Sequence, residues 1–279
     1  MAYPQVAAPY GLKPINLIGG QVFAGATRSL PIQYGYATDI GYGDFVKLVR
    51  GTIQRQSVST AGGGAGMVGV FLGCSFTNPV TKQKTFSQYW PAGTAAGDAV
   101  AIVCDDPDTV FKAVVCSSGT TVASGSIAMV GQNYQMINNS VNLNTGDSAN
   151  ALLYSATLTT STFAMRAVGV VPDTAITTSA TGSSSSTTIT LTGSGLPSAI
   201  PVGTDVAYVA SNGQLIETGS FVSVAAAAGA TSVTINTAID VPGSVTAIPA
   251  SSTIVFTQYP EMLVKINFGI HEYYTATAV

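Results

Sequence analysis

The chain has 279 residues, of which 46% are hydrophobic and only 8% are charged, and its formal net charge is −3. Disordered chains combine low hydrophobicity with high charge, so this composition indicates a folded protein. The 10 basic residues form no cluster beyond Lys82 and Lys84, which argues against nucleic-acid binding. No apolar run reaches the roughly 18 residues that a membrane span needs. So few charges suit a subunit whose surface associates with other subunits.

Residues 1–33 predict an extended N-terminal arm. They lack a helical period and contain four prolines and a glycine pair, at Pro4, Pro9, Pro14, Pro31 and Gly19-Gly20. Each proline removes a backbone donor and biases the preceding residue toward extended geometry. The first residues lack the basic and apolar regions of a secretory signal, so we expect the chain to be made in a cytoplasm.

From residue 34 onward, short alternating segments predict an all-β base domain that comprises residues 34–173 and 258–279, with a β-sandwich or barrel-like fold. A turn built from Gly and Asp recurs before β-branched runs, at Gly43-Asp44, Gly97-Asp98 and Gly203-Thr204-Asp205. Such turns followed by alternating apolar residues are typical of strands. Residues 144–153 could form one short helix. The base strands are expected at 45–49, 68–75, 99–103, 110–115, 127–130, 154–158, 163–171 and 261–268, and the arm is expected to contain a short strand at 21–23.

The most informative pattern is an internal repeat between residues 187 and 257. A strand at 187–191 recurs at 231–235, with an offset of 44 residues. The Ala-Ile-Pro loop and strand that follow at 199–208 recur at 247–256, with an offset of 48 residues. A two-unit repeat is too short for a solenoid, which usually needs about three units. We therefore expect residues 174–257 to form an accessory domain, a small pseudo-twofold β-barrel inserted between two strands of the base.

The three cysteines, Cys74, Cys104 and Cys116, lie in apolar strand contexts. An odd number in such contexts favours buried, reduced thiols. A disulfide between Cys104 and Cys116 is the alternative.

Two motifs invite a chemical interpretation that their context does not support. Residues 64–69 match the G-x-G-x-x-G pattern of dinucleotide-binding loops, but a strand-like segment follows where a helix is required, and 84–90 contain no acid for the ribose. The acidic run Asp105-Asp106-Pro107-Asp108 could supply oxygens to a cation, but a turn with Asx bonding also explains it. We expect neither a cofactor nor a metal.

The single histidine and the single tryptophan are the remaining candidates. His271 has no second metal-ligating residue at a recognisable spacing, so we expect it at a solvated strand position. A Ser-His-Asp arrangement forms in space rather than in sequence, so it stays open as the weaker alternative. Trp90, beside Tyr89 and Pro91, is interpreted as a core anchor or an intersubunit contact; a sugar-binding platform is the alternative.

Several segments together resemble structural proteins of tailed phages, of marine and cyanophage type, and most of all the capsid decoration or cement proteins. The segments are 9–14, 42–47, 69–74, 83–86, 89–93 and 105–113. The resemblance covers residues 1–172 and 258–279, and it implies a non-enzymatic virion protein on the outer capsid surface, assembled in a bacterial cytoplasm. It implies a homotrimer that binds the major capsid protein and bridges its neighbouring subunits.

A tail or fibre component is the alternative that stays open, and a carbohydrate-active enzyme is a third. If the protein decorates a capsid, its arm is expected to lie over the capsid surface, where it could add a strand to a capsid loop. The candidate capsid or intersubunit contacts are Tyr3, Tyr10, Leu12, Lys13, Ile15, Leu17, Tyr89 and Trp90.

Overall fold

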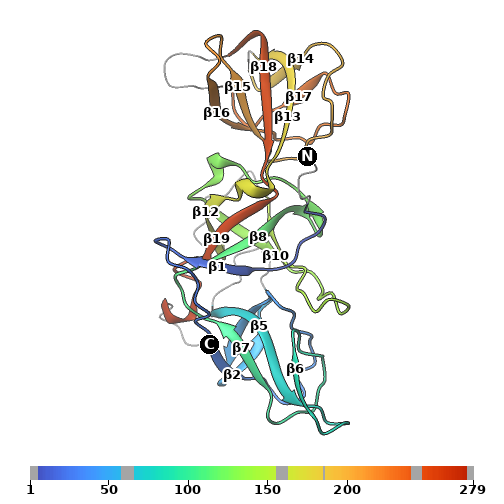
Figure 1. The fold of residues 1–279 in the computed structure, drawn as a ribbon, viewed down its shortest axis with the longest axis vertical. Coiled ribbons are helices and arrows are strands. Elements are labelled where there is room, and N and C mark those ends of the chain that lie inside the picture. Colours follow the sequence, from blue (N-terminus) through green and yellow to red (C-terminus); the bar gives the residue numbers. More distant parts are fainter. Residues whose placement is uncertain (1–5, 58–65, 155–162, 185, 240–246, 275–279) are drawn as a thin grey trace.

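A computed structural model describes residues 6–57, 66–154, 163–184, 186–239 and 247–274. It is all-β, as predicted: the described residues form three sheets, and their helical turns are three short 3₁₀ turns. The sheets lie one after another along the long axis of the molecule (Figure 1). From the bottom of that view we call them the lower, middle and upper modules.

The lower module is built from residues 28–104. Its strands pair in the order β2-β7-β5-β3-β4, with β6 on a further stretch of β5. A parallel bridge between Ile32 and Ile53 joins the end of β2 to β4, so the pairings close into a ring. Phe71, Trp90 and Val103 fill its core. The strands are β2 (Arg28–Pro31), β3 (Phe45–Val49), β4 (Thr52–Arg55), β5 (Met67–Thr77), β6 (Lys84–Ser87) and β7 (Val100–Cys104).

The middle module combines three distant parts of the chain. Its long strand β8 pairs with β19 on one edge and with β1 and β11 on the other, and β11-β10-β12-β19 completes a second ring. Phe111, Tyr134 and Met165 lie in its core. The strands are β1 (Lys13–Leu17), β8 (Thr109–Ser118), β9 (Thr121–Val122), β10 (Asn133–Ile137), β11 (Ala151–Leu153), β12 (Met165–Val170) and β19 (Glu261–Ile266).

The upper module is a six-stranded sheet of residues 176–258, in the order β16-β15-β18-β13-β14-β17. A bridge between Val222 and Ile235 joins the end of β16 to the end of β17 and closes a third ring. The first and last residues of the module, Ile176 and Gln258, are direct partners. The strands are β13 (Ile176–Ser184), β14 (Thr188–Leu191), β15 (Asp205–Val209), β16 (Leu215–Phe221), β17 (Ser232–Thr234) and β18 (Ile248–Gln258).

The registers of the upper module are symmetric about the sequence repeat. Strands β14 and β17 pair through Ile189 and Val233, which occupy the same position in the two copies at the offset of 44. Strands β15 and β18 pair through Ala207 and Val255, which are equivalent at the offset of 48. Two equivalent residues that face each other in antiparallel strands define a local twofold axis, and here the two pairs of strands do so independently.

The two ends of this symmetric module differ where one of them meets the middle module. Asp205 pairs with Phe221, which belongs to the core of the middle module. At the other end, the equivalent residue Thr253 pairs with Thr181, so Thr181 is the counterpart of Phe221. Gly203 and its counterpart Ser251 both have positive φ, 84° and 61°. A Cβ on Gly203 would lie 1.9 Å from the Ser124 carbonyl oxygen of the middle module. The end that docks therefore requires a glycine that the free end does not.

Several local expectations were wrong, for identifiable reasons. Residues 144–153 form turns and then β11 rather than a helix. Residues 127–130 contain the 3₁₀ turn η1 (Ile127–Met129), because the Ser126 side chain caps it by accepting from the Ala128 amide. The strand expected at 21–23 is reduced to a single bridge between Val22 and Asn16, and the short strands of the arm are instead β1, which pairs with β8, and β2, which pairs with β7. The strand expected at 154–158 lies almost entirely outside the described residues.

We expect Gly203→Ala to destabilise the protein by about 1–3 kcal/mol more than Gly213→Ala, because overpacking adds to the left-handed strain that both share. Gly213 is a matched control, since its φ is 81° and a Cβ there meets nothing within 4 Å. Thermal unfolding followed by circular dichroism measures both. Equal losses would show that the Ser124 carbonyl does not press on Gly203.

Candidate functional site

The buried carboxylates of the described residues lie at the contacts between the modules. Each joint contains a carboxylate that is almost completely buried: Asp44 is 0% exposed, Glu261 is 2% exposed and Asp205 is 5% exposed. A buried carboxylate destabilises a fold strongly unless hydrogen bonds or an opposite charge compensate it. The partners of these three groups therefore show how the modules are held together.

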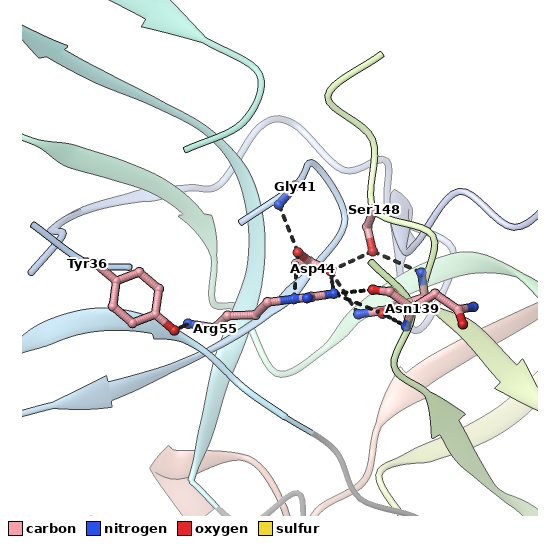
Figure 2. A network of polar contacts seen from close by, with 7 residues as sticks. Tyr36, Gly41, Asp44, Arg55, Asn139 and Ser148 are labelled. Atoms are coloured by element: carbon pink, nitrogen blue, oxygen red, sulfur yellow. Dashed lines mark hydrogen bonds and ion pairs between the residues drawn. The ribbon is translucent and has the colours of Figure 1, made fainter. Parts of the chain in front are cut away.

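Asp44 joins the lower module to the middle module (Figure 2). Its Oδ2 accepts from the Gly41 amide at 2.8 Å and lies 3.0 Å from Nε of Arg55 on β4. Its Oδ1 accepts from two side chains of the loop before β11, from Ser148 Oγ at 2.6 Å and from Asn150 Nδ2 at 2.8 Å. The carboxylate thus collects donors from both modules.

Arg55, the ion-pair partner of Asp44, also contacts both modules. Arg55 donates through Nη2 to the Asn139 carbonyl at 2.6 Å, and the Asn139 amide donates to Asn150 Oδ1 at 3.0 Å (Figure 2). Burial raises the pKa of Asp44, and the Arg55 charge and the hydrogen bonds from Ser148 and Gly41 oppose that rise. The pair is a fixed cross-link between the two modules.

Glu261 ties the arm to the start of the upper module. At the beginning of β19, it accepts a short hydrogen bond from the Tyr10 hydroxyl and one of 3.0 Å from Thr174 Oγ1, in the turn η2 (Pro172–Thr174) just before β13. Lys112 on β8 lies 3.4 Å from the same carboxylate. Burial first, and then Glu261, raise the pKa of Tyr10 above its usual range, so this phenol remains a donor.

Asp205 joins the upper module to the middle module. It accepts a short hydrogen bond from Ser126 Oγ and one of 2.7 Å from the Ile127 amide, at the start of η1. Nearby, the Ser124 amide donates to the Val202 carbonyl at 3.0 Å, and the rings of Tyr154 and Phe221 meet edge-on at 6.4 Å. Burial raises the pKa of Asp205 to about 6, against the effect of its two hydrogen bonds.

The residues proposed as capsid or intersubunit contacts differ in how exposed they are. Lys13, Ile15 and Leu17 lie on β1, and Ile15 is exposed. Tyr10 is engaged by Glu261, and Tyr89 is half-buried. Leu12 and Trp90 are fully buried, so these two serve the core rather than a surface. Tyr3 lies outside the described residues.

Of the interpretations of Trp90, the structure supports the core anchor. Its ring meets Phe76 edge-on with centroids 5.4 Å apart, and its Nε1 donates to the Tyr36 carbonyl at 3.2 Å. This burial excludes its ring as a sugar-binding platform.

The other chemical candidates resolve into structural roles. His271 was expected in water, but it is buried, and its Nδ1 accepts from the Tyr273 amide at 3.2 Å. Burial lowers the pKa of His271, so the neutral ring is favoured. The acidic run forms an Asx turn, in which the Asp108 amide donates to Asp106 Oδ1 at 2.9 Å. Among the described residues, no group of three or more His, Cys, Asp or Glu side chains is placed to hold a metal ion.

The glycine-rich pattern and the cysteines are also accounted for. Residues 58–65 lie outside the described part, and the strand β5 begins at Met67, where a dinucleotide loop would require a helix. Cys74, Cys104 and Cys116 are buried free thiols, so the alternative Cys104–Cys116 disulfide is not formed. Burial raises the pKa of Cys74 to about 12 and that of Cys116 to about 11, which leaves both as unreactive thiols.

Comparison of the chain with protein-family models, with curated proteins and with solved structures finds no match. The family resemblance therefore rests on the sequence segments that carry it. Within the described part of the chain, no helix is long and apolar enough to cross a membrane.

We expect Asp44→Asn to destabilise the protein by about 3 kcal/mol, because it leaves the largely buried Arg55 without its counter-charge. Asp108→Asn is the control, since the Asp108–Lys265 pair of 3.2 Å is solvent-exposed and should contribute less than about 1 kcal/mol. Urea unfolding followed by the fluorescence of Trp90, the only tryptophan, measures both. Similar losses for the two variants would contradict the role of Asp44 as a cross-link.

Proposed function

We propose that this chain is a virion structural protein that decorates the assembled capsid of a tailed phage and stabilises it by bridging neighbouring major capsid protein subunits. The observation that carries the proposal is the form of the molecule: three β modules in line, cross-linked at both joints by buried carboxylates (Figure 1). A clamp must transmit force between its contacts without bending, and such joints supply that property. The phage-like sequence segments point the same way.

We further infer that the three rings of strands are small barrels and that the upper one is a pseudo-twofold accessory domain of residues 174–257. The closed pairings and the symmetric registers support this inference. The two ends of its sheet, Ile176 and Gln258, are paired, and an insertion between two strands of a base is expected to have neighbouring ends.

The distribution of exposed apolar side chains suggests which end faces the capsid. Three large ones project from the lower module: Val80 is 86% exposed, Phe86 is 79% exposed and Tyr34 is 67% exposed. Exposed apolar surface of this kind often marks an interaction site. The lower module, together with Lys13, Ile15 and Leu17 on β1 of the middle module, is then the capsid-binding surface, and the upper module points outward.

The proposed role is non-enzymatic, and the protein acts as a homotrimer on the outer surface of the virion. Asp44, Asp205 and Glu261 support the absence of catalysis in a specific way, because each is occupied by hydrogen bonds that hold parts of the chain together. The elongated form also suits a tail or fibre component, which is the second candidate. Copy number separates the two, since a capsid carries hundreds of decoration subunits and a tail only a few.

We expect particles that lack this protein to assemble but to burst at lower temperature, because many modest contacts on a closed lattice resist separation together. The measurement compares bursting temperatures with and without the protein and counts its copies per particle. Equal bursting temperatures together with a few copies per particle would favour the tail or fibre role.

Phe86→Asp should weaken binding to capsids at least about tenfold, as loss of an interface anchor does. Leu215→Asp is the matched control, because Leu215 is also exposed but lies on β16 of the upper module. Binding of each purified variant to capsid particles that lack the decoration protein is measured by co-sedimentation. A stronger effect of Leu215→Asp would place the contact surface on the upper module.

A further inference from the structure

We propose that the joint between the upper and middle modules is pH-sensitive, that it closes more tightly in mildly acidic solution, and that Asp205 is its sensor. This inference concerns the mechanics of the chain and does not depend on the proposed function. It begins from the position of Asp205, which is 5% exposed and lies where η1 of the middle module meets β15.

Asp205 differs from Asp44 in the kind of partners that surround it. Asp44 faces the guanidinium of Arg55, whereas Asp205 is held by two uncharged donors, the Ser126 hydroxyl and the Ile127 amide. Residues 174–257 contain no Lys or Arg at all, so the upper module offers it no counter-charge. A carboxylate buried with neutral donors alone is poorly compensated when it is ionised.

Among the described residues, the titratable groups recorded to interact with Asp205 are acids. Glu217 lies on β16, Tyr134 on β10 and Tyr259 just before β19. Tyr154, which follows β11, interacts with Tyr134. Glu217 raises the pKa of Asp205, after burial as the larger cause. Burial raises the pKa of all three tyrosines, so they stay neutral between pH 5 and pH 8, and burial also raises that of Glu217. The neighbours thus reinforce the preference for a neutral Asp205.

The direction of the pH response follows from this preference. The pKa of Asp205 is about 6 in the closed joint, above the value of about 3.9 of a solvated aspartate. An acid whose pKa is higher in the closed state stabilises that state when it is protonated. This stabilisation is complete below the pKa of the open state and is lost as the pH rises through the pKa of the closed state. Between pH 5 and pH 8 the closing equilibrium should weaken about tenfold.

Two backbone amides report the joint directly. The Ser124 amide donates to the Val202 carbonyl, and the Ile127 amide donates to Asp205, so both hydrogen bonds cross from the middle to the upper module. The Ala167 amide, which donates to the Gln132 carbonyl within the middle module, is a reference. Hydrogen exchange of these amides, corrected for the intrinsic rate at each pH, measures local opening.

We expect the protection of Ser124 and Ile127 to fall about tenfold from pH 5 to pH 8 while that of Ala167 stays constant. Asp205→Asn, an isosteric mimic of the neutral acid, should keep protection high at both pH values. Glu217→Gln is the matched control and should retain the fall. A constant protection in the unmodified protein, or an undiminished fall in Asp205→Asn, would overturn the proposal.

A second measurement keeps the test decisive if Asp205→Asn does not fold. The carboxyl carbon of Asp205 in the unmodified protein is followed by NMR as the pH changes. A midpoint near 6 supports the proposal, and a midpoint near 4 overturns it.

Discussion

A carboxylate that is removed from water needs donors, and in this protein the donors come from the parts of the chain that must be joined. Asp44 takes them from both the lower and the middle module, and Asp205 takes them from the middle module alone. Glu261 connects the arm to the turn before the upper module. If one partner moves away, the carboxylate loses compensation, so each joint favours a single arrangement.

The sequence contained part of this information in its Gly-Asp turns, and the rest required three dimensions. All three turns are visible in the sequence, and two of them supply the joint carboxylates Asp44 and Asp205, whereas Asp98 is exposed and pairs with Lys84. Nothing local to the chain distinguishes them, because burial depends on which module lies opposite. The same limit explains Leu12, Trp90 and His271, whose environments are set by distant segments, and η1, whose turn is fixed by its contacts.

The repeat could be found because both copies keep the same alternation of residues, and the structure shows how the copies differ. The end of the upper module that docks carries Gly203, Asp205 and Phe221, and the free end carries Ser251, Thr253 and Thr181 at the equivalent positions. Each difference favours contact at one end only. The divergence of two similar units thus gives a symmetric module a defined orientation on its base, which a clamp or post with one outward end requires.

The central claim is that buried carboxylates couple the three modules into one unit, and calorimetry tests it most directly. Coupled modules should unfold in a single transition near neutral pH, with the calorimetric enthalpy equal to the van't Hoff enthalpy. Two or more resolved transitions, with the upper module melting independently of the lower two, would contradict the claim.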